Sequence, residues 1–224
     1  MQKHQTALVL IDLQKESNFG LVNMDAVVKH TKRLIKACRS ANIPIIYTRQ
    51  INRVDNIGLS VGEPSNDDGS PFFYNSNTDQ IEIIDELKPE ESDIVIDKYR
   101  WSAFYETPLD LILRSLGVTE LFIGGVVTDG CLMTSVFDAY FRDYNIHLIH
   151  DISSASNEGA HKSSILTMAN WIYNLKVYDT ENIVKKIQGG SYDCWKPAQV
   201  DSLHFTAENM DEQFQKIINK EKGE

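Results

Sequence analysis

The chain has 224 residues, of which 42% are hydrophobic and 24% are charged, and its formal net charge is −10. These proportions are typical of a single globular domain with a sizeable core, and they exclude a fibrous or a disordered chain. The excess of acidic residues argues against a nucleic-acid partner that binds through bulk positive charge.

Short runs rich in β-branched residues alternate with longer stretches of helical periodicity. The expected strands are 7–11, 44–48, 93–97, 121–125, 146–150 and 175–178; the expected helices are 25–41, 108–116, a stretch after the fourth strand to about residue 142, and 158–170. Nearly continuous apolar strands separated by helices predict a parallel sheet covered on both faces by right-handed crossovers. We therefore predict an α/β fold, a three-layer α-β-α sandwich around a mostly parallel six-stranded sheet.

Two long segments interrupt this alternation, at 51–79 and 188–206, and both are rich in turn-forming residues. Long loops of this kind are often lids or binding loops. Beyond them, 207–219 has apolar residues at helical spacing and must pack on another surface. We expect one domain over 1–187 and a C-terminal extension over 188–224, which packs on the same domain or on a neighbouring subunit.

No run of about 18 apolar residues occurs, and the N-terminus enters a strand pattern without the regions of a signal peptide. The three cysteines are odd in number and widely spaced, which fits reduced thiols better than disulfides. Cys38 lies on a helical apolar stripe and is expected in the core, whereas the role of Cys194 is open. We expect a cytoplasmic protein with no membrane partner.

Three chemically distinct side chains each follow a predicted strand: Asp12, Lys98 and Cys131. Ligands of open parallel sheets bind beyond the carboxyl ends of the strands, so these positions converge on the expected binding edge. Each residue also has a purely structural interpretation: the Asp as a turn residue, the Lys as a solvated charge, and the Cys as a small core hydrophobe. Their shared edge favours a joint functional role.

The three residue types suit nucleophilic catalysis. An ammonium group and a helix N-terminus favour a thiolate, and a carboxylate can accept the thiol proton and return it to a leaving nitrogen. The segment GGVVTDGC at 124–131 provides small residues between a strand and a helix, so the amides of Val127 and Cys131 are candidate oxyanion donors. A tight strand-to-helix turn without a ligand is the alternative.

The chain resembles the isochorismatase-like cysteine hydrolases, which include nicotinamidases, N-carbamoylsarcosine amidase, ureidoacrylate amidohydrolase and biuret hydrolase. Three blocks carry the resemblance: LVLIDLQ with Asp12, DKYRWSAFYETPLD with Lys98, and LGVTELFIGGVVTDGC with Cys131. It implies a general base at Asp12, a cationic partner at Lys98 and a nucleophile at Cys131 that forms an acyl-thioester. It also implies a cis peptide at Val126–Val127, and a homo-dimer or homo-tetramer, to which the apolar stripe of 207–219 would contribute.

The chain departs from two branches of that family. Nicotinamidases carry metal-binding histidines after the second strand, where this chain reads YTRQINRVDN, and His147 and His150 lie on opposite faces of one strand. We therefore expect no metal and no cofactor. The isochorismatases lack a cysteine at the position of Cys131, and the block KYRWSAFYETPLDLIL resembles the ureidoacrylate and carbamoyl-amide branch.

The resemblance thus favours a metal-independent amidohydrolase acting on a small-molecule amide, ureido or carbamoyl substrate. The alternatives are a nicotinamidase-like or isochorismatase-type hydrolase, and a non-catalytic or redox-sensing binding protein. Candidate substrate contacts are residues next to the three blocks or in the 51–79 loop. For the aromatic candidates the alternative is ordinary packing, and for the arginine candidate it is a solvated surface position. They are Phe19, Arg49, Gln50, Phe72, Phe73, Trp101 and Tyr105.

Overall fold

The computed structural model describes residues 4–199 and 201–219, so residues 1–3, 200 and 220–224 of the two expected regions lie outside the described part. A six-stranded sheet forms its centre, with strand order β3-β2-β1-β4-β5-β6 and parallel pairing throughout. The predicted α/β fold is confirmed. The strands are β1 (Thr6–Ile11), β2 (Ile45–Gln50), β3 (Ile94–Lys98), β4 (Glu120–Gly125), β5 (Asn145–Ile149) and β6 (Lys176–Tyr178).

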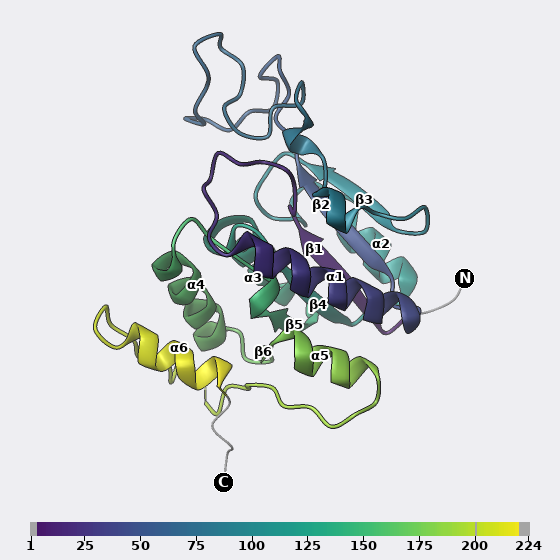
Figure 1. Cartoon of the computed structure of the whole chain (residues 1–224), viewed down its shortest axis with the longest axis vertical. Coiled ribbons are helices and arrows are strands. Elements are labelled where there is room, and N and C mark those ends of the chain that lie inside the picture. Colours follow the sequence, from purple (N-terminus) through teal and green to yellow (C-terminus); the bar gives the residue numbers. More distant parts are fainter. Residues whose placement is uncertain (1–3, 200, 220–224) are drawn as a thin grey trace.

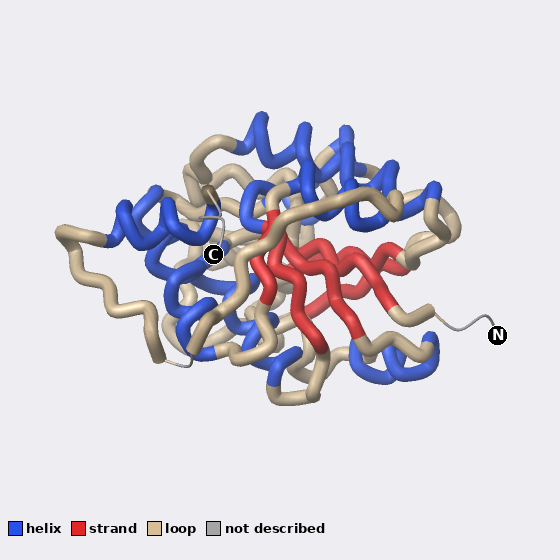
Figure 2. Tube along the Cα trace, turned by 90° about the horizontal axis from the view of Figure 1, so that it is seen from below, coloured by secondary structure: helices blue, strands red, loops and turns tan. Residues whose placement is uncertain are grey.

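Helices cover both faces of the sheet, which gives three layers (Figures 1 and 2). Helices α1 and α5 pack on one face, and α2, α3, α4 and α6 pack on the other. The helices are α1 (Met24–Ser40), α2 (Leu109–Leu116), α3 (Met133–Tyr140), α4 (Glu158–Trp171), α5 (Thr180–Ile187) and α6 (Met210–Ile218).

Strand β1 lies in the middle of the sheet and is buried on both faces. Leu8 and Leu10 contribute to the core beneath α1 and α5, whereas Ala7, Val9 and Ile11 contribute to the core beneath the other layer. Because side chains alternate between the two faces of a strand, a strand with two buried faces is apolar at every position. The run ALVLI therefore predicts a central strand correctly.

The strand order reverses its direction of growth between β1 and β4, and this switch point is where open α/β sheets bind ligands. The two strands approach closely at Gly125, whose φ is +131°; a Cβ there would lie 2.1 Å from the backbone oxygen of Ile11. Only glycine fits both the conformation and the space. The sequence GG at this point thus allows the residues after both strands to meet.

The apolar stripe of 207–219 was expected to contribute to an oligomer contact, but it is covered by its own chain. In α6, Phe214 and Ile217 are buried in the core of the same chain, where α6 packs against α4. The stripe therefore needs no second subunit to cover it, and it gives no argument for a dimer or tetramer. Helix α5 was not among the expected helices. Within the described ranges, no helix is long and apolar enough to cross a membrane.

Candidate active site

A buried ion pair joins the ends of β1 and β3. The Oδ2 atom of Asp12 lies 2.7 Å from the Nζ atom of Lys98, and neither side chain exposes any surface. The other carboxylate oxygen accepts a hydrogen bond of 2.7 Å from the hydroxyl of Thr48, which in turn accepts the Asp12 amide at 3.2 Å. Strand β2 thereby orients the carboxylate that follows β1.

The ammonium of Lys98 has a partner for each of its three N–H groups. Besides the Asp12 carboxylate, these are the side-chain oxygen of Gln50 at 3.0 Å and the carbonyl of Arg100 at 3.1 Å. Burial by itself lowers the pKa of Lys98, but the negative charge of Asp12 and the neighbouring Cys131 outweigh it, so the pKa is raised above its ordinary value. Lys98 is therefore charged and fixed in place.

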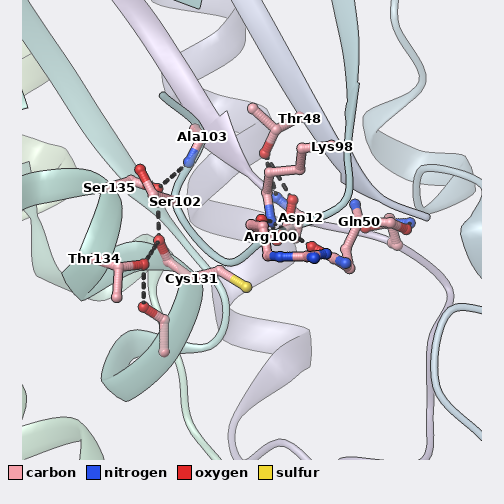
Figure 3. A network of polar contacts seen from close by, with 12 residues as sticks. Asp12, Thr48, Gln50, Lys98, Arg100, Ser102, Ala103, Cys131, Thr134 and Ser135 are labelled. Carbon is pink, nitrogen blue, oxygen red and sulfur yellow. Dashed lines mark hydrogen bonds and ion pairs between the residues drawn. The ribbon is translucent and has the colours of Figure 1, made fainter. Parts of the chain in front are cut away.

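Cys131 sits on a π-helical turn, Thr128–Leu132, that connects β4 to α3. The hydroxyl of Ser135 donates to the Cys131 carbonyl at 2.6 Å and accepts the amide of Ala103 at 2.8 Å, which ties the turn to the segment after β3. Figure 3 shows the sulfur of Cys131 pointing toward Asp12 and Lys98. Hydrogen bonding to Asp12 raises the pKa of the Cys131 thiol, and hydrogen bonding to Lys98 lowers it.

The thiol of Cys131 is protonated at neutral pH. Burial is the main cause that raises its pKa to about 12; Lys98 opposes this rise, and the negative charge of Asp12 adds to it. The sequence led us to expect a thiolate favoured by Lys98 and by a helix N-terminus. Lys98 acts in the expected direction, but the loss of hydration is the larger effect, because the side chain is almost fully buried.

The turn before Cys131 contributes backbone amides to the wall of a cavity that opens above the thiol. The Val126–Val127 peptide bond is cis. The amide of Val126 donates to β1 at the carbonyl of Ile11, and that of Thr128 donates to the carbonyl of Ser154. In the described ranges, the intervening amide of Val127 donates to no carbonyl outside its own turn. Val127 and Cys131 both line the cavity, as an oxyanion site requires.

A cavity of about 430 Å³ opens above Cys131. Four of the predicted substrate contacts line it: Phe19, Gln50, Phe73 and Trp101. The rings of Phe19 and Phe73 stack with centroids 4.2 Å apart, so the loops after β1 and β2 form one aromatic wall.

The other predicted contacts lie elsewhere. Tyr105 is half exposed and does not line the cavity. Arg49 pairs with Asp97 and Glu82 at the surface, in line with the solvated alternative, because β3 places Asp97 directly beside it. Phe72 does not line the cavity and packs edge-on against Phe73.

Several cavity residues were not predicted from the sequence. Glu63 and Pro64 come from the middle of the 51–79 loop, Tyr74 from its end, and Asp129 and Ser156 from the turns after β4 and β5. The signal that could have identified Asp129 is its place within GGVVTDGC, the segment that supplies the candidate oxyanion donors. The loop residues carried no such signal, since a loop of this length has no periodicity that would orient its side chains.

The histidines do not gather at this cavity. His147 packs in the core between the rings of Phe122 and Tyr178, and His150 lines a different cavity next to His161. Within 4–199 and 201–219, no three His, Cys, Asp or Glu side chains are arranged to hold a metal ion.

Comparison with known proteins agrees with this architecture. The family model described as "Isochorismatase domain" matches residues 6–182. A ureidoacrylate amidohydrolase, RutB, of Acinetobacter baylyi is 28% identical over 82% of this chain and 84% of its own length.

Among solved structures, a cysteine hydrolase of Pseudomonas syringae pv. phaseolicola superposes with a TM-score of 0.73 at 24% identity, covering 83% of this chain and 93% of that one. N-carbamoylsarcosine amidase of Thermoplasma acidophilum gives a TM-score of 0.65 at 24% identity, over 80% and 98% of the two chains. Both likenesses show a shared fold.

Proposed function

Because this chain belongs to the isochorismatase family, we propose that it is a metal-independent cysteine amidohydrolase that cleaves a C–N bond of a small amide, ureido or carbamoyl compound. One observation carries the proposal: a buried ion pair, with Asp12 and Lys98 2.7 Å apart, interacts with the thiol of Cys131, and Cys131 lines the cavity. The relatives named as amidohydrolase and amidase support the choice of a C–N bond.

In the first half-reaction, the sulfur of Cys131 attacks the substrate carbonyl carbon while the Asp12 carboxylate takes the thiol proton. The carbonyl oxygen becomes an oxyanion, which the amides of Val127 and Cys131 stabilise. When the tetrahedral intermediate collapses, the C–N bond breaks and Asp12 returns the proton to the departing nitrogen. Ammonia or an amine leaves, and the acyl group stays on sulfur as a thioester.

In the second half-reaction, water replaces the departed amine. Asp12 takes one proton from the water as its oxygen attacks the thioester carbon, and the same amides stabilise the second oxyanion. Collapse breaks the C–S bond, and Asp12 delivers its proton to the sulfur. The acid product leaves, and the neutral thiol of Cys131 is restored.

The protonated resting thiol makes the base essential. With the pKa of Cys131 raised to about 12 by burial, very little thiolate exists at neutral pH, so attack requires proton removal in the same step. The Asp12 carboxylate is suited to this, because it is in hydrogen-bonding contact with the Cys131 thiol and is itself paired with the Lys98 ammonium.

The same burial argues against a redox-sensing role. Oxidation of cysteine follows thiolate character and exposure, and the Cys131 thiol has little of either. The nicotinamidase-like alternative lacks its histidine ligands after β2, where Gln50 instead hydrogen-bonds Lys98. The isochorismatase-type alternative has no use for a cysteine nucleophile.

The proposal is tested by ammonia release across ureido acids, carbamoyl amino acids, biuret and nicotinamide, combined with mass detection of an acyl adduct. We expect turnover of at least one C–N substrate and a hydroxylamine-sensitive adduct on Cys131. The Cys131→Ser variant should lose both, while the Cys194→Ser variant, altered at a partly exposed thiol that does not line the cavity, should keep both. Turnover that survives Cys131→Ser would refute the thioester mechanism.

A further inference from the structure

The cavity above Cys131 has acidic walls. Two carboxylates line it, those of Glu63 and Asp129, and within the described ranges no Lys, Arg or His side chain does. From this we infer that the substrate is a small amide or ureide whose far end carries a positive charge, such as an ammonium or guanidinium group, and that Glu63 recognises this charge. The inference rests on the proposed function, since it names the substrate class of the same site.

Glu63 is held in place by a buried neighbour. One of its oxygens accepts a hydrogen bond from the side-chain amide of Asn52, which is 2% exposed and also donates to the carbonyl of Phe73 at 3.1 Å. Its own amide donates to the carbonyl of Ser60. The second carboxylate oxygen of Glu63 has no hydrogen-bond or ion-pair partner in the described part of the chain, so it is available to a ligand.

The cationic side chains around the active site do not line the cavity. Lys98 uses its three N–H groups on Asp12, Gln50 and Arg100, and its side chain is fully buried. Arg49 pairs with Asp97 at the surface. The guanidinium of Arg100 donates to the carbonyls of Gly58 and Tyr99. None of these three side chains lines the cavity, so a substrate carboxylate bound there would face Glu63 and Asp129.

The remaining walls favour a cation as well. Aromatic rings of Phe19, Phe73, Tyr74 and Trp101 line the cavity, and the faces of such rings attract ammonium and guanidinium groups. Tyr74 adopts a left-handed backbone conformation with φ +48°, held by its amide donating to Glu16 at 2.7 Å. The surrounding structure holds this unfavourable backbone conformation and so fixes the place of Tyr74 in the cavity wall.

A matched substrate series tests the inference: butylurea, aminobutylurea and ureidobutyrate share the ureido group and differ at the far end in charge. We expect kcat/KM for ammonia release at neutral pH and low salt to be highest for aminobutylurea and lowest for ureidobutyrate. The preference should be at least about tenfold, equivalent to about 1.4 kcal/mol. It should decline at high salt, which screens a partly exposed carboxylate.

The Glu63→Gln variant keeps an oxygen for Asn52 and removes the charge. It should reduce the preference for aminobutylurea over ureidobutyrate by about tenfold. The control is Asp67→Asn, which makes the same change in net charge in the same loop but outside the cavity, and which should leave the preference unchanged. An equal effect of the two variants would overturn the assignment to Glu63.

Calorimetric binding of the three compounds to a Cys131→Ala variant separates this inference from the proposed function. Tighter binding of aminobutylurea that depends on Glu63 supports the inference even if no turnover or Cys131 adduct is found, in which case the proposed function fails alone. Fastest hydrolysis of ureidobutyrate through a Cys131 adduct overturns the inference and leaves the proposed function standing. Binding of none of the three compounds also overturns the inference.

Discussion

The Asp12→Asn variant tests the buried ion pair and the proposed base at once. An asparagine keeps an oxygen for the Thr48 hydroxyl, which now lies 2.7 Å from Oδ1. In place of Oδ2, however, it sets an NH₂ group 2.7 Å from the Lys98 ammonium, so that two donors face each other in a site with no exposed surface. The variant therefore removes the proton acceptor and leaves a buried charge without its counter-ion.

Two magnitudes follow. Loss of a general base lowers kcat by about 10²- to 10⁴-fold. Breaking a buried ion pair by removing one partner costs about 3–5 kcal/mol of folding free energy, which is less than the whole stability of many domains, at about 5–15 kcal/mol. The variant should therefore fold, with lower stability and almost no activity.

The pH dependence of the variant has a definite sign. Without Asp12, burial is left as the largest influence on Lys98 and lowers its pKa below the ordinary value of 10.5. The unfolded chain then binds the proton more tightly than the folded one, so the free energy of unfolding rises as pH increases toward 10.5. The destabilisation relative to the parent protein is therefore large near neutral pH and shrinks in alkaline solution.

The assay combines urea unfolding with ammonia release for Asp12→Asn, Lys98→Met and the double variant. We expect the double variant to regain at least half of the stability lost by Asp12→Asn, because the ammonium that faced the amide is gone, while activity stays absent. If the two losses of stability simply add to within about 0.5 kcal/mol, the pair is not coupled. If Asp12→Asn turns over the true substrate at the parental rate, Asp12 is not the base.

Three further predictions use other features of the molecule. Iodoacetamide at pH 8 should modify Cys194 well before Cys131, because burial raises the pKa of Cys131 to about 12; peptide mapping that finds Cys131 modified first would contradict this. Gly125→Ala should lower the free energy of unfolding in urea by at least about 2 kcal/mol more than Gly189→Ala does. Both positions have positive φ, but only at Gly125 would the new Cβ meet backbone, at 2.1 Å. Equal losses would exclude the clash. Burial, reinforced by a nearby His and Lys, lowers the pKa of His161 to about 4. The free energy of unfolding should therefore fall by up to about 1.4 kcal/mol per pH unit as the pH drops from 6.5 toward 4. The His161→Gln variant should flatten that slope.

Much of the fold was predictable because its central strands are apolar on both faces. Each expected strand overlaps the observed one, with ends that differ by at most two residues. The helix after β3 shows how local chemistry sets an end: the Thr107 hydroxyl accepts the amide of Leu109, and Gly117 ends the helix with φ +79°. Threonine before a helix and glycine after it are residue types that indicate such limits in a sequence.

Helix α5 escaped prediction because it is short and follows β6 directly. Its start is marked by Asp179, whose side chain accepts the amide of Asn182, and its apolar residues Ile183 and Val184 are buried. A carboxylate cap followed by apolar residues at helical spacing was therefore legible in DTENIVKKI. The burial of α6 on its own chain was not legible, because an apolar stripe shows that a partner exists without showing which one.

The convergence of Asp12, Lys98 and Cys131 was predictable from their positions after strands, since parallel strands end at one edge. The upward shift of the Cys131 pKa could not be predicted, because it depends on how completely the surrounding loops exclude water. The cavity wall was equally hidden. The orientation of Tyr74 depends on a hydrogen bond to Glu16, which lies 58 residues earlier in the sequence, and that contact exists only in the folded chain.

The depth of burial is consistent with the proposed chemistry once charges are counted. In the resting state, a neutral thiol, the Asp12 carboxylate and the Lys98 ammonium sum to zero. When the thiol proton moves to Asp12 and an oxyanion forms, Lys98 and the oxyanion again sum to zero, and the same holds in the second half-reaction. Charge is relocated within the site without a net charge ever being created in a place where hydration cannot stabilise it. A preformed thiolate beside Asp12 would break this balance, which is the physical reason why burial and a protonated Cys131 belong together.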